Sequence, residues 1–146
     1  MAVSITLYNH TASKFADGSF AVGDTYKLKL YSALTPDATH TTLSAVDAGG
    51  GTEATTGTGY TTGGQTLANV AVNIATTNDA VFDADDVTWT ASGGSIAAAY
   101  GVIYNDTDAG DPPLAYINFD GTQTAGDGTD FIVSWNASGI VTFTVA

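Results

Sequence analysis

Acidic side chains carry most of the chemistry that this sequence could perform. The chain has 146 residues, with 15 Asp or Glu against three Lys or Arg, two His, no Cys, and a formal net charge of −12. The absence of Cys excludes disulfides, thiolate zinc sites, iron–sulfur clusters and cysteine nucleophiles. Oxygen ligands for a metal ion and paired carboxylates are therefore the chemistry that remains to be considered.

The densest set of oxygen ligands is the run Asn105–Pro113 (NDTDAGDPP). Asp106, Asp108 and Asp111 place three carboxylates near a Gly, loosely as in a calcium-binding loop. The run lacks the distal Glu of an EF-hand, and Asn, Asp and Gly are ordinary turn residues. A solvated hairpin loop is the simpler interpretation, calcium bound by these three residues is the alternative, and no other cofactor is expected.

A second acidic group precedes a predicted strand in the run VFDADDVTW, where Asp83, Asp85 and Asp86 lie close together. A glycosidase needs two carboxylates at a fixed separation, one of them with a pKa raised by burial. Asp residues in a turn between strands more commonly bond to the local backbone. We interpret these three residues as turn residues.

Other catalytic arrangements are missing from the sequence. There is no GxSxG motif, and His10 and His40 both lie in polar, turn-like surroundings. The run Gly59–Gly64 (GYTTGG) lacks the GK[ST] ending of a phosphate-binding loop and indicates a turn. We therefore expect that the protein is not an enzyme.

The charge distribution argues against several classes of partner. From residue 74 onward the sequence has ten acidic residues and no Lys or Arg. Such a surface repels phosphate backbones, so we expect no nucleic-acid partner. No apolar run approaches the ~18–20 residues of a membrane span, and the N-terminal MAVSITLY has no basic leader, so we expect neither a membrane partner nor a signal peptide.

Alternating apolar residues predict strands along most of the chain. About eight or nine short strands separated by turn signals predict an all-β fold, a single-domain antiparallel β-sandwich, jelly-roll-like, over residues 1–146. Ile96–Tyr104 is apolar on both faces and predicts a central strand, with Leu114–Phe119 as its antiparallel neighbour. Phe131–Trp135 and Gly139–Ala146, joined by NASG, predict a terminal hairpin. The other candidate strands are Val3–Tyr8, Thr25–Ala33, Gln65–Ile74, Asp79–Phe82 and Val87–Ala91.

Two segments outside this pattern are less regular. Residues 1–24 are expected to hold the N-terminal strand followed by turns. Residues 47–64 are rich in Gly and Thr with little to bury, and predict a long flexible loop or arm. Because this segment is the least suited to a core, it supplies the expected partner-binding residues, which are Gly50, Thr52, Glu53, Gly59, Tyr60 and Thr61.

An ordered set of motifs resembles small structural proteins of tailed bacteriophages. The resemblance covers roughly residues 25–145, and GTGYTTGG, DDVTW and WNASGI in this order are more specific than any one of them alone. The runs that carry it are TYKLKLYSALTPDATHTTLSAV, GTGYTTGGQTLA, FDADDVTWTAS, AAYGVIYNDT, PLAYINFDG and FIVSWNASGIVTF.

This resemblance implies a capsid decoration (cement) protein with a β-sandwich or jelly-roll fold. Its partner would be the phage major capsid protein, and self-association, with a trimer as one arrangement, would be expected. Such a protein is made in the host cytoplasm and resides on the outer capsid surface of the virion. Strong negative charge suits that surface, which does not approach the packaged DNA.

Two other functions remain open on the sequence. The first is a tail or fibre module that binds host surface glycans, with Tyr31, Tyr60, Trp89 and Trp135 as candidates for stacking on sugars. The second is a secreted bacterial adhesin domain, which the missing signal peptide disfavours. A glycan binder predicts a shallow aromatic groove and saturable binding to polysaccharide, whereas a decoration protein predicts many copies per particle.

Overall fold

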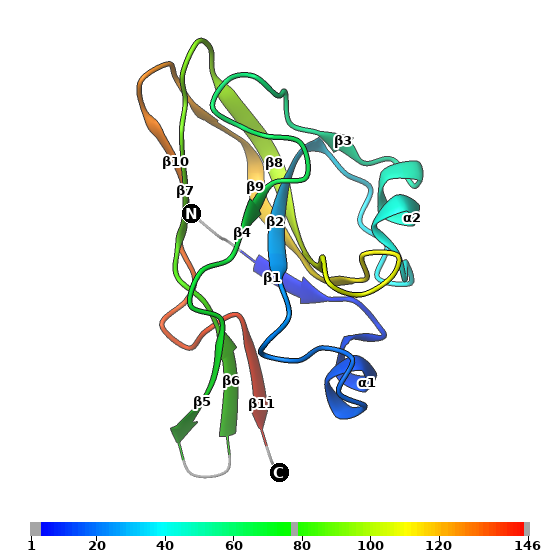
Figure 1. Ribbon diagram of the computed structural model, residues 1–146. Helices are drawn as coiled ribbons and strands as arrows, with labels where there is room; N and C mark the ends of the chain where they lie inside the picture. Colours follow the sequence, from blue (N-terminus) through cyan, green and yellow to red (C-terminus); the bar gives the residue numbers. More distant parts are fainter. Residues whose placement is uncertain (1–3, 77–78, 145–146) are drawn as a thin grey trace.

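The computed structural model describes residues 4–76 and 79–144 of the chain (Figure 1). Strands make up 44% of the residues and helices 9%, in an antiparallel, sandwich-like single domain, so the predicted fold class is confirmed. The described residues form 11 strands rather than eight or nine, and two of these strands have only two residues each.

The large sheet has six strands and is centred on β8 (Ile96–Asn105), which lies between β9 (Pro113–Ala125) and β2 (Tyr26–Ala33). The predicted central strand and its antiparallel neighbour are both confirmed by this order. Gly101 on β8 permits close packing, because a Cβ there would lie 3.0 Å from Leu28 Cδ1. The remaining strands of the sheet are β1 (Ser4–Leu7), β3 (Thr52–Glu53) and β4 (Gln65–Thr66).

Two smaller sheets pack against one face of the large sheet. The first pairs β7 (Val87–Thr90) with β10 (Asp130–Val133). The second has the order β11–β6–β5, formed by β5 (Ala71–Thr76), β6 (Asp79–Asp83) and β11 (Val141–Thr144). Alternate side chains of all three sheets meet in the main core, which includes Leu28, Leu30, Phe82, Trp89, Ile103, Ile117, Phe131 and Val133.

The opposite face of the large sheet is covered as well. Helix α2 (Leu43–Ala48) buries Leu43 and Val46 over this face, against a second apolar cluster that includes Tyr31. The alternation along β2 therefore places Lys29 and Tyr31 under α2 instead of in solvent.

The two helices have six residues each, which is too short to give the periodic pattern that predicts a helix. α2 begins after Thr42, whose side chain accepts a hydrogen bond from Ala45 N at 3.2 Å. α1 (Thr11–Ala16) lies in the segment expected to contain only a strand and turns. Among the described residues no helix is both long and apolar enough to cross a membrane.

The predicted terminal hairpin is wrong. β10 pairs with β7 and β11 pairs with β6, so the two strands belong to different sheets. Between them, Gly139 has a φ of +82° and its N–H bonds to Asn136 O at 2.8 Å, while Ile140 N–H bonds to Phe82 O at 3.0 Å. This turn carries the chain from one small sheet to the other.

The GYTTGG turn generates a prediction about stability. Gly18 and Gly64 have nearly the same φ, +81° and +84°, but a Cβ on Gly18 meets nothing within 4 Å, whereas a Cβ on Gly64 collides with Leu28 O. Gly18→Ala should therefore cost only the left-handed backbone penalty of about 1–2 kcal/mol. Gly64→Ala should cost at least about 2 kcal/mol more, measured as the free energy of unfolding in urea. Equal losses in the two variants would contradict the close approach of this turn to β2.

Candidate functional site

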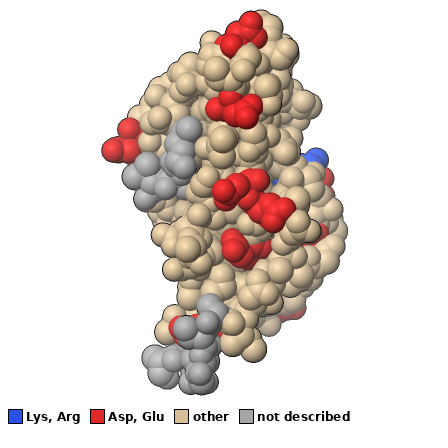
Figure 2. Space-filling model, turned by 90° about the vertical axis from the view of Figure 1, so that its left-hand side faces the viewer, with Lys and Arg blue, Asp and Glu red and all other residues tan. Residues whose placement is uncertain are grey.

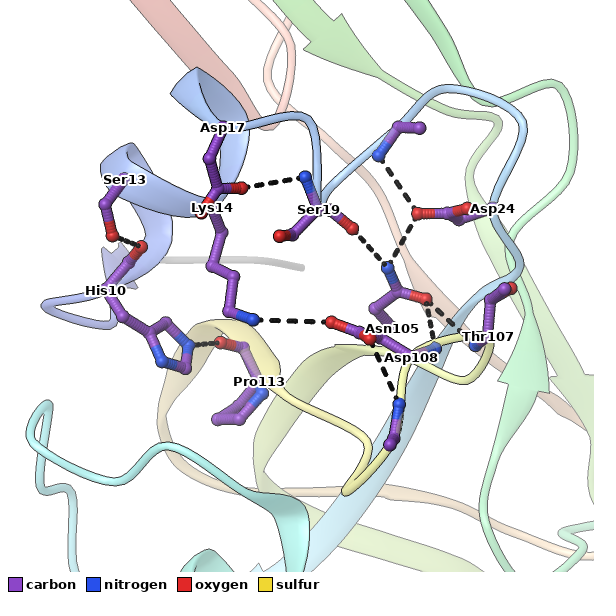
Figure 3. A network of polar contacts seen from close by, with 12 residues as sticks. His10, Ser13, Lys14, Asp17, Ser19, Asp24, Asn105, Thr107, Asp108 and Pro113 are labelled. Carbon is purple, nitrogen blue, oxygen red and sulfur yellow. Dashed lines mark hydrogen bonds and ion pairs between the residues drawn. The ribbon is translucent and has the colours of Figure 1, made fainter.

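The candidate calcium loop joins β8 to β9 and is organised by Asn105, a buried polar side chain at the end of β8. Asn105 Oδ1 accepts hydrogen bonds from Thr107 N at 2.9 Å and Asp108 N at 3.3 Å (Figure 3). Its Nδ2 donates to Asp24 Oδ2 at 2.8 Å. The Asn105 side chain therefore links its own loop to the turn that contains Asp24, which is a structural role.

The three carboxylates of this loop are not brought together. Asp106 Oδ2 lies 2.9 Å from Lys27 Nζ, and Asp108 Oδ2 lies 3.4 Å from Lys14 Nζ. Across residues 4–76 and 79–144, no group of three or more His, Cys, Asp or Glu side chains is arranged to hold a metal ion. Two of the expected calcium ligands instead face lysines from distant parts of the sequence.

The β8–β9 loop and the first residues of β9 are held against the segment before β2 by contacts between side chains and backbone atoms. His10 Nε2 lies 2.7 Å from Pro113 O (Figure 3), and Thr11 Oγ1 donates to Leu114 O at 2.6 Å. Thr25 N donates to Thr107 Oγ1 at 2.8 Å. These contacts give His10 a positioning role at one end of the large sheet.

The Gly/Thr-rich segment 47–64 is fixed against the large sheet rather than forming a free arm. Lys29 Nζ, on β2, lies 2.9 Å from Asp47 Oδ1 and 3.5 Å from Glu53 Oε2. The Tyr31 hydroxyl donates to Asp47 Oδ1 at 2.7 Å. Asp47 is in α2 and Glu53 is in β3, so one buried ammonium holds both elements on the face of β2.

Tyr60 is the second anchor of this segment. Its side chain is 2% exposed, its hydroxyl accepts from Leu30 N at 3.0 Å and it donates to Glu53 Oε1 at 3.0 Å. Gly63 N also donates to Glu53 Oε1, at 2.6 Å. The expectation that Tyr60 contacts a partner is therefore corrected, because its side chain lies in the core. Glu53 is half-buried, and the exposed members of the predicted set are Gly50, Thr52, Gly59 and Thr61.

The acidic group near β7 also makes structural contacts. Asp85 Oδ2 accepts from Asn69 Nδ2 at 2.6 Å, and Asp86 Oδ1 accepts from Trp135 N at 2.9 Å. Asp83 is half-buried, and its Oδ1 has no hydrogen-bond partner within the described part of the chain. Two of the three carboxylates thus fix the corner between strands, as expected of turn residues.

Three of the four aromatic candidates for sugar stacking are buried. Tyr31 is 0%, Tyr60 2% and Trp89 5% exposed. Trp135 is half-buried, and its indole Nε1 donates to Asp85 O at 2.8 Å. These four side chains do not form a shared exposed groove.

The sequence did not indicate the most distinctive surface, which lies on the small sheet β11–β6–β5. Two rows of paired residues cross this sheet and lie on the same face of it. The first row is Phe143, Ala80 and Ile74, and the second, two residues along each strand, is Val141, Phe82 and Val72. Phe82 is fully buried under α1, with Phe15 at a ring-centroid distance of 5.3 Å. Farther along the sheet the cover ends, and Val72 is 44% and Ile74 83% exposed.

An open apolar pocket of about 300 Å³ adjoins this face. Phe15 and Phe143 meet edge to face at 5.0 Å, and the exposed Ala12 and Ala16 of α1 complete the lining. We refer to the pocket residues together with Val72 and Ile74 as the apolar end. Alternation alone predicts that such strand residues are buried, so only the three-dimensional arrangement shows that they are uncovered.

The charged side chains of the molecule are mostly carboxylates, 15 against three lysines. Figure 2 shows acidic side chains distributed down the face that carries β7 and β10, with lysine only at its margin. All three lysines of the chain, Lys14, Lys27 and Lys29, are paired with carboxylates of the same chain. The apolar end therefore belongs to a molecule with no lysine left to attract an acidic partner.

Buried tyrosines give a prediction about alkaline stability. Burial is the main cause that raises the pKa of five hydroxyls above the usual value of 10.0, those of Tyr8, Tyr26, Tyr31, Tyr60 and Tyr104. Because the folded pKa values are raised, these groups contribute stability that is fully present below about pH 10 and lost as the pH rises further. The free energy of unfolding should therefore fall steeply above about pH 10, and tyrosinate absorbance from these residues should appear together with loss of the circular dichroism signal. Full ionisation of all tyrosines in a folded protein would contradict their burial.

Comparison with known proteins gives no family for this chain: no family model, curated protein or solved structure matches it.

Proposed function

We propose that this protein is a non-enzymatic structural component of a tailed-phage virion, a capsid decoration protein that binds the outer surface of the assembled head. The proposed partner is the phage major capsid protein, and the proposed effect is to stabilise contacts between capsomers. The protein would be made in the host cytoplasm and reside on the outer capsid surface.

The apolar end is the observation that carries this proposal. On the β11–β6–β5 sheet, Ile74 is 83% and Val72 44% exposed on one outer strand, and Phe143 on the other outer strand lines an open apolar pocket, which together is an unusual amount of uncovered apolar surface for a small domain. Such surfaces mark contacts with other macromolecules. The acidic face shown in Figure 2 is chemically suited to remain in solvent.

Decoration requires no reaction, only preferential binding to the assembled state. A protein that binds the assembled shell, and not its dissociated subunits, shifts the equilibrium toward the shell by mass action. The hydrogen bonds and ion pairs around Asn105, Lys29 and Tyr60 fix the connections between strands. This suits the task, because a rigid domain loses little conformational entropy when it binds.

The test is binding to DNA-filled, undecorated capsids of the source phage, followed by pelleting and quantification of the bound copies. The wild-type protein should saturate at a fixed number per particle and raise the heat resistance of the particle. Ala16→Glu, in the pocket, should weaken binding by about tenfold or more, equivalent to about 1.4 kcal/mol.

Ala137→Glu is the matched control, because it adds the same charge at an exposed alanine in the turn before Gly139. It should bind like the wild type. Failure of the wild-type protein to pellet with capsids would rule out decoration and favour the tail or fibre module. Equal binding by both variants would leave decoration intact and show that the apolar end is not the contact surface.

A further inference from the structure

Strand β5 is an edge strand without the usual protection against pairing. It pairs only with β6 among the described strands, and the register is regular from Ala71 to Ile74. Its sequence, AVNIAT, has no charged residue and no Pro, although 15 of the 146 residues in the chain are acidic. Natural edge strands commonly carry such residues because unpaired backbone groups otherwise recruit another strand.

The two faces of β5 have different chemistry. Val72 and Ile74 lie on the apolar face, where Ala80 separates Ile74 from Phe143 across about 10 Å, or two strand spacings. Asn73 lies on the opposite face, which it shares with Val81 and Asp83 of β6. A strand added beside β5 would therefore lie against Val72 and Ile74 on one face and against Ala71 and Asn73 on the other, with Asp83 one strand farther away.

The Asp83 carboxylate defines the charge that such a strand needs. Asp83 is opposite Ala71, whose side chain is small enough for a long basic side chain from the next strand to cross. The carboxylate is half-buried, and its Oδ1 is enclosed by the chain without a hydrogen-bond partner in the described residues, so a basic side chain of the added strand would lie near the carboxylate without bonding to that oxygen. Lysine or arginine at this position of an added strand would compensate that charge.

A second copy of the chain does not meet these requirements. It would bring another net charge of −12, and all three of its lysines are paired within the chain. A short, basic extended segment of a different protein fits the charge of this edge.

We propose that β5 is a docking edge that accepts an extended segment of a partner protein by backbone pairing. The segment has apolar residues at alternate positions, against Val72 and Ile74, and a lysine or arginine on the face of Asp83. Backbone bonds would supply affinity and the alternate side chains would supply specificity. Where the partner is the capsid protein, this inference rests on the proposed function.

The first test uses a synthetic peptide of alternating valine and threonine flanked by lysines, with a glutamate-flanked version for comparison. The lysine peptide should slow amide hydrogen exchange in residues 71–76 and not in 130–133. The glutamate peptide should bind at least about tenfold more weakly.

Ile74→Asp should weaken binding of the lysine peptide by about tenfold or more. Ile132→Asp is the matched control, because Ile132 is 40% exposed on β10 of the other small sheet and the substitution adds the same charge. It should bind the peptide within about twofold of the wild type.

The same two variants are then bound to undecorated capsids, which separates this proposal from the proposed function. Protection of residues 71–76 by the peptide, without wild-type binding to capsids, would support the docking edge and overturn decoration. Wild-type binding to capsids that Ile74→Asp leaves unchanged would support decoration and overturn the docking edge.

Two further results would overturn the docking edge. One is a lack of protection of residues 71–76 by either the lysine peptide or the capsid. The other is self-association in analytical ultracentrifugation that Ile74→Asp abolishes, since the occupant of the edge would then be a second copy.

Discussion

The buried ammonium of Lys29 is the contact on which the outer layer of the large sheet depends. Apolar contacts of Leu43 and Val46 bring α2 onto the sheet, but the Gly/Thr-rich chain that follows has few apolar side chains to hold it in place. Lys29 holds this segment in place instead, because it pairs with Asp47 at 2.9 Å and with Glu53 at 3.5 Å. Glu53 in turn accepts hydrogen bonds from the Tyr60 hydroxyl and from Gly63 N, so the GYTTGG turn is held in place as well.

The pairing of all three lysines with carboxylates of the same chain determines the charge of the molecular surface. Lys14 and Lys27 pair with Asp108 and Asp106 and so help close the β8–β9 connection against the segment before β2. Because a chain with 15 acidic residues has no other strong cation, its exposed surface is left acidic. Ile74, which at 83% has the highest exposed fraction among the large apolar side chains of the described residues, belongs to the apolar end, where α1 covers only part of the β11–β6–β5 face. The pairing of every lysine within the chain thus limits the chemistry of any partner.

The sequence predicted what depends on local pattern. A run that is apolar on both faces identified β8 as a central strand, with β9 as its neighbour, because the burial of both faces of β8 is reflected directly in its residues. The turn at Gly59–Gly64 was likewise recognised, and Gly64 N bonds to Thr61 O at 3.0 Å. The terminal hairpin failed because two adjacent strands joined by a short turn normally pair, and nothing local shows that Gly139 redirects the chain to β6.

Long-range polar contacts explain most of what the sequence could not show about the candidate site. The aspartates of the β8–β9 connection resemble cation ligands until Lys14 and Lys27, about 80–95 residues earlier, are placed beside them. Segment 47–64 resembles a free arm until Asp47 and Glu53 are seen around Lys29. The exposed Ile74 gives no local signal either, because an uncovered strand face and a buried one have the same alternation. Each of these features depends on which elements meet in space.

The central claim is that this domain meets its partner through the apolar end and leaves its acidic face in solvent. A cryo-electron microscopy reconstruction of the decorated particle, at a resolution that distinguishes strands, would test it most directly. We expect β5, β11 and α1 to lie against the shell, with a strand of the capsid protein continuing the β11–β6–β5 sheet beyond β5. A reconstruction in which the β7–β10 face or residues 47–64 contact the shell, with Ile74 facing solvent, would contradict this account.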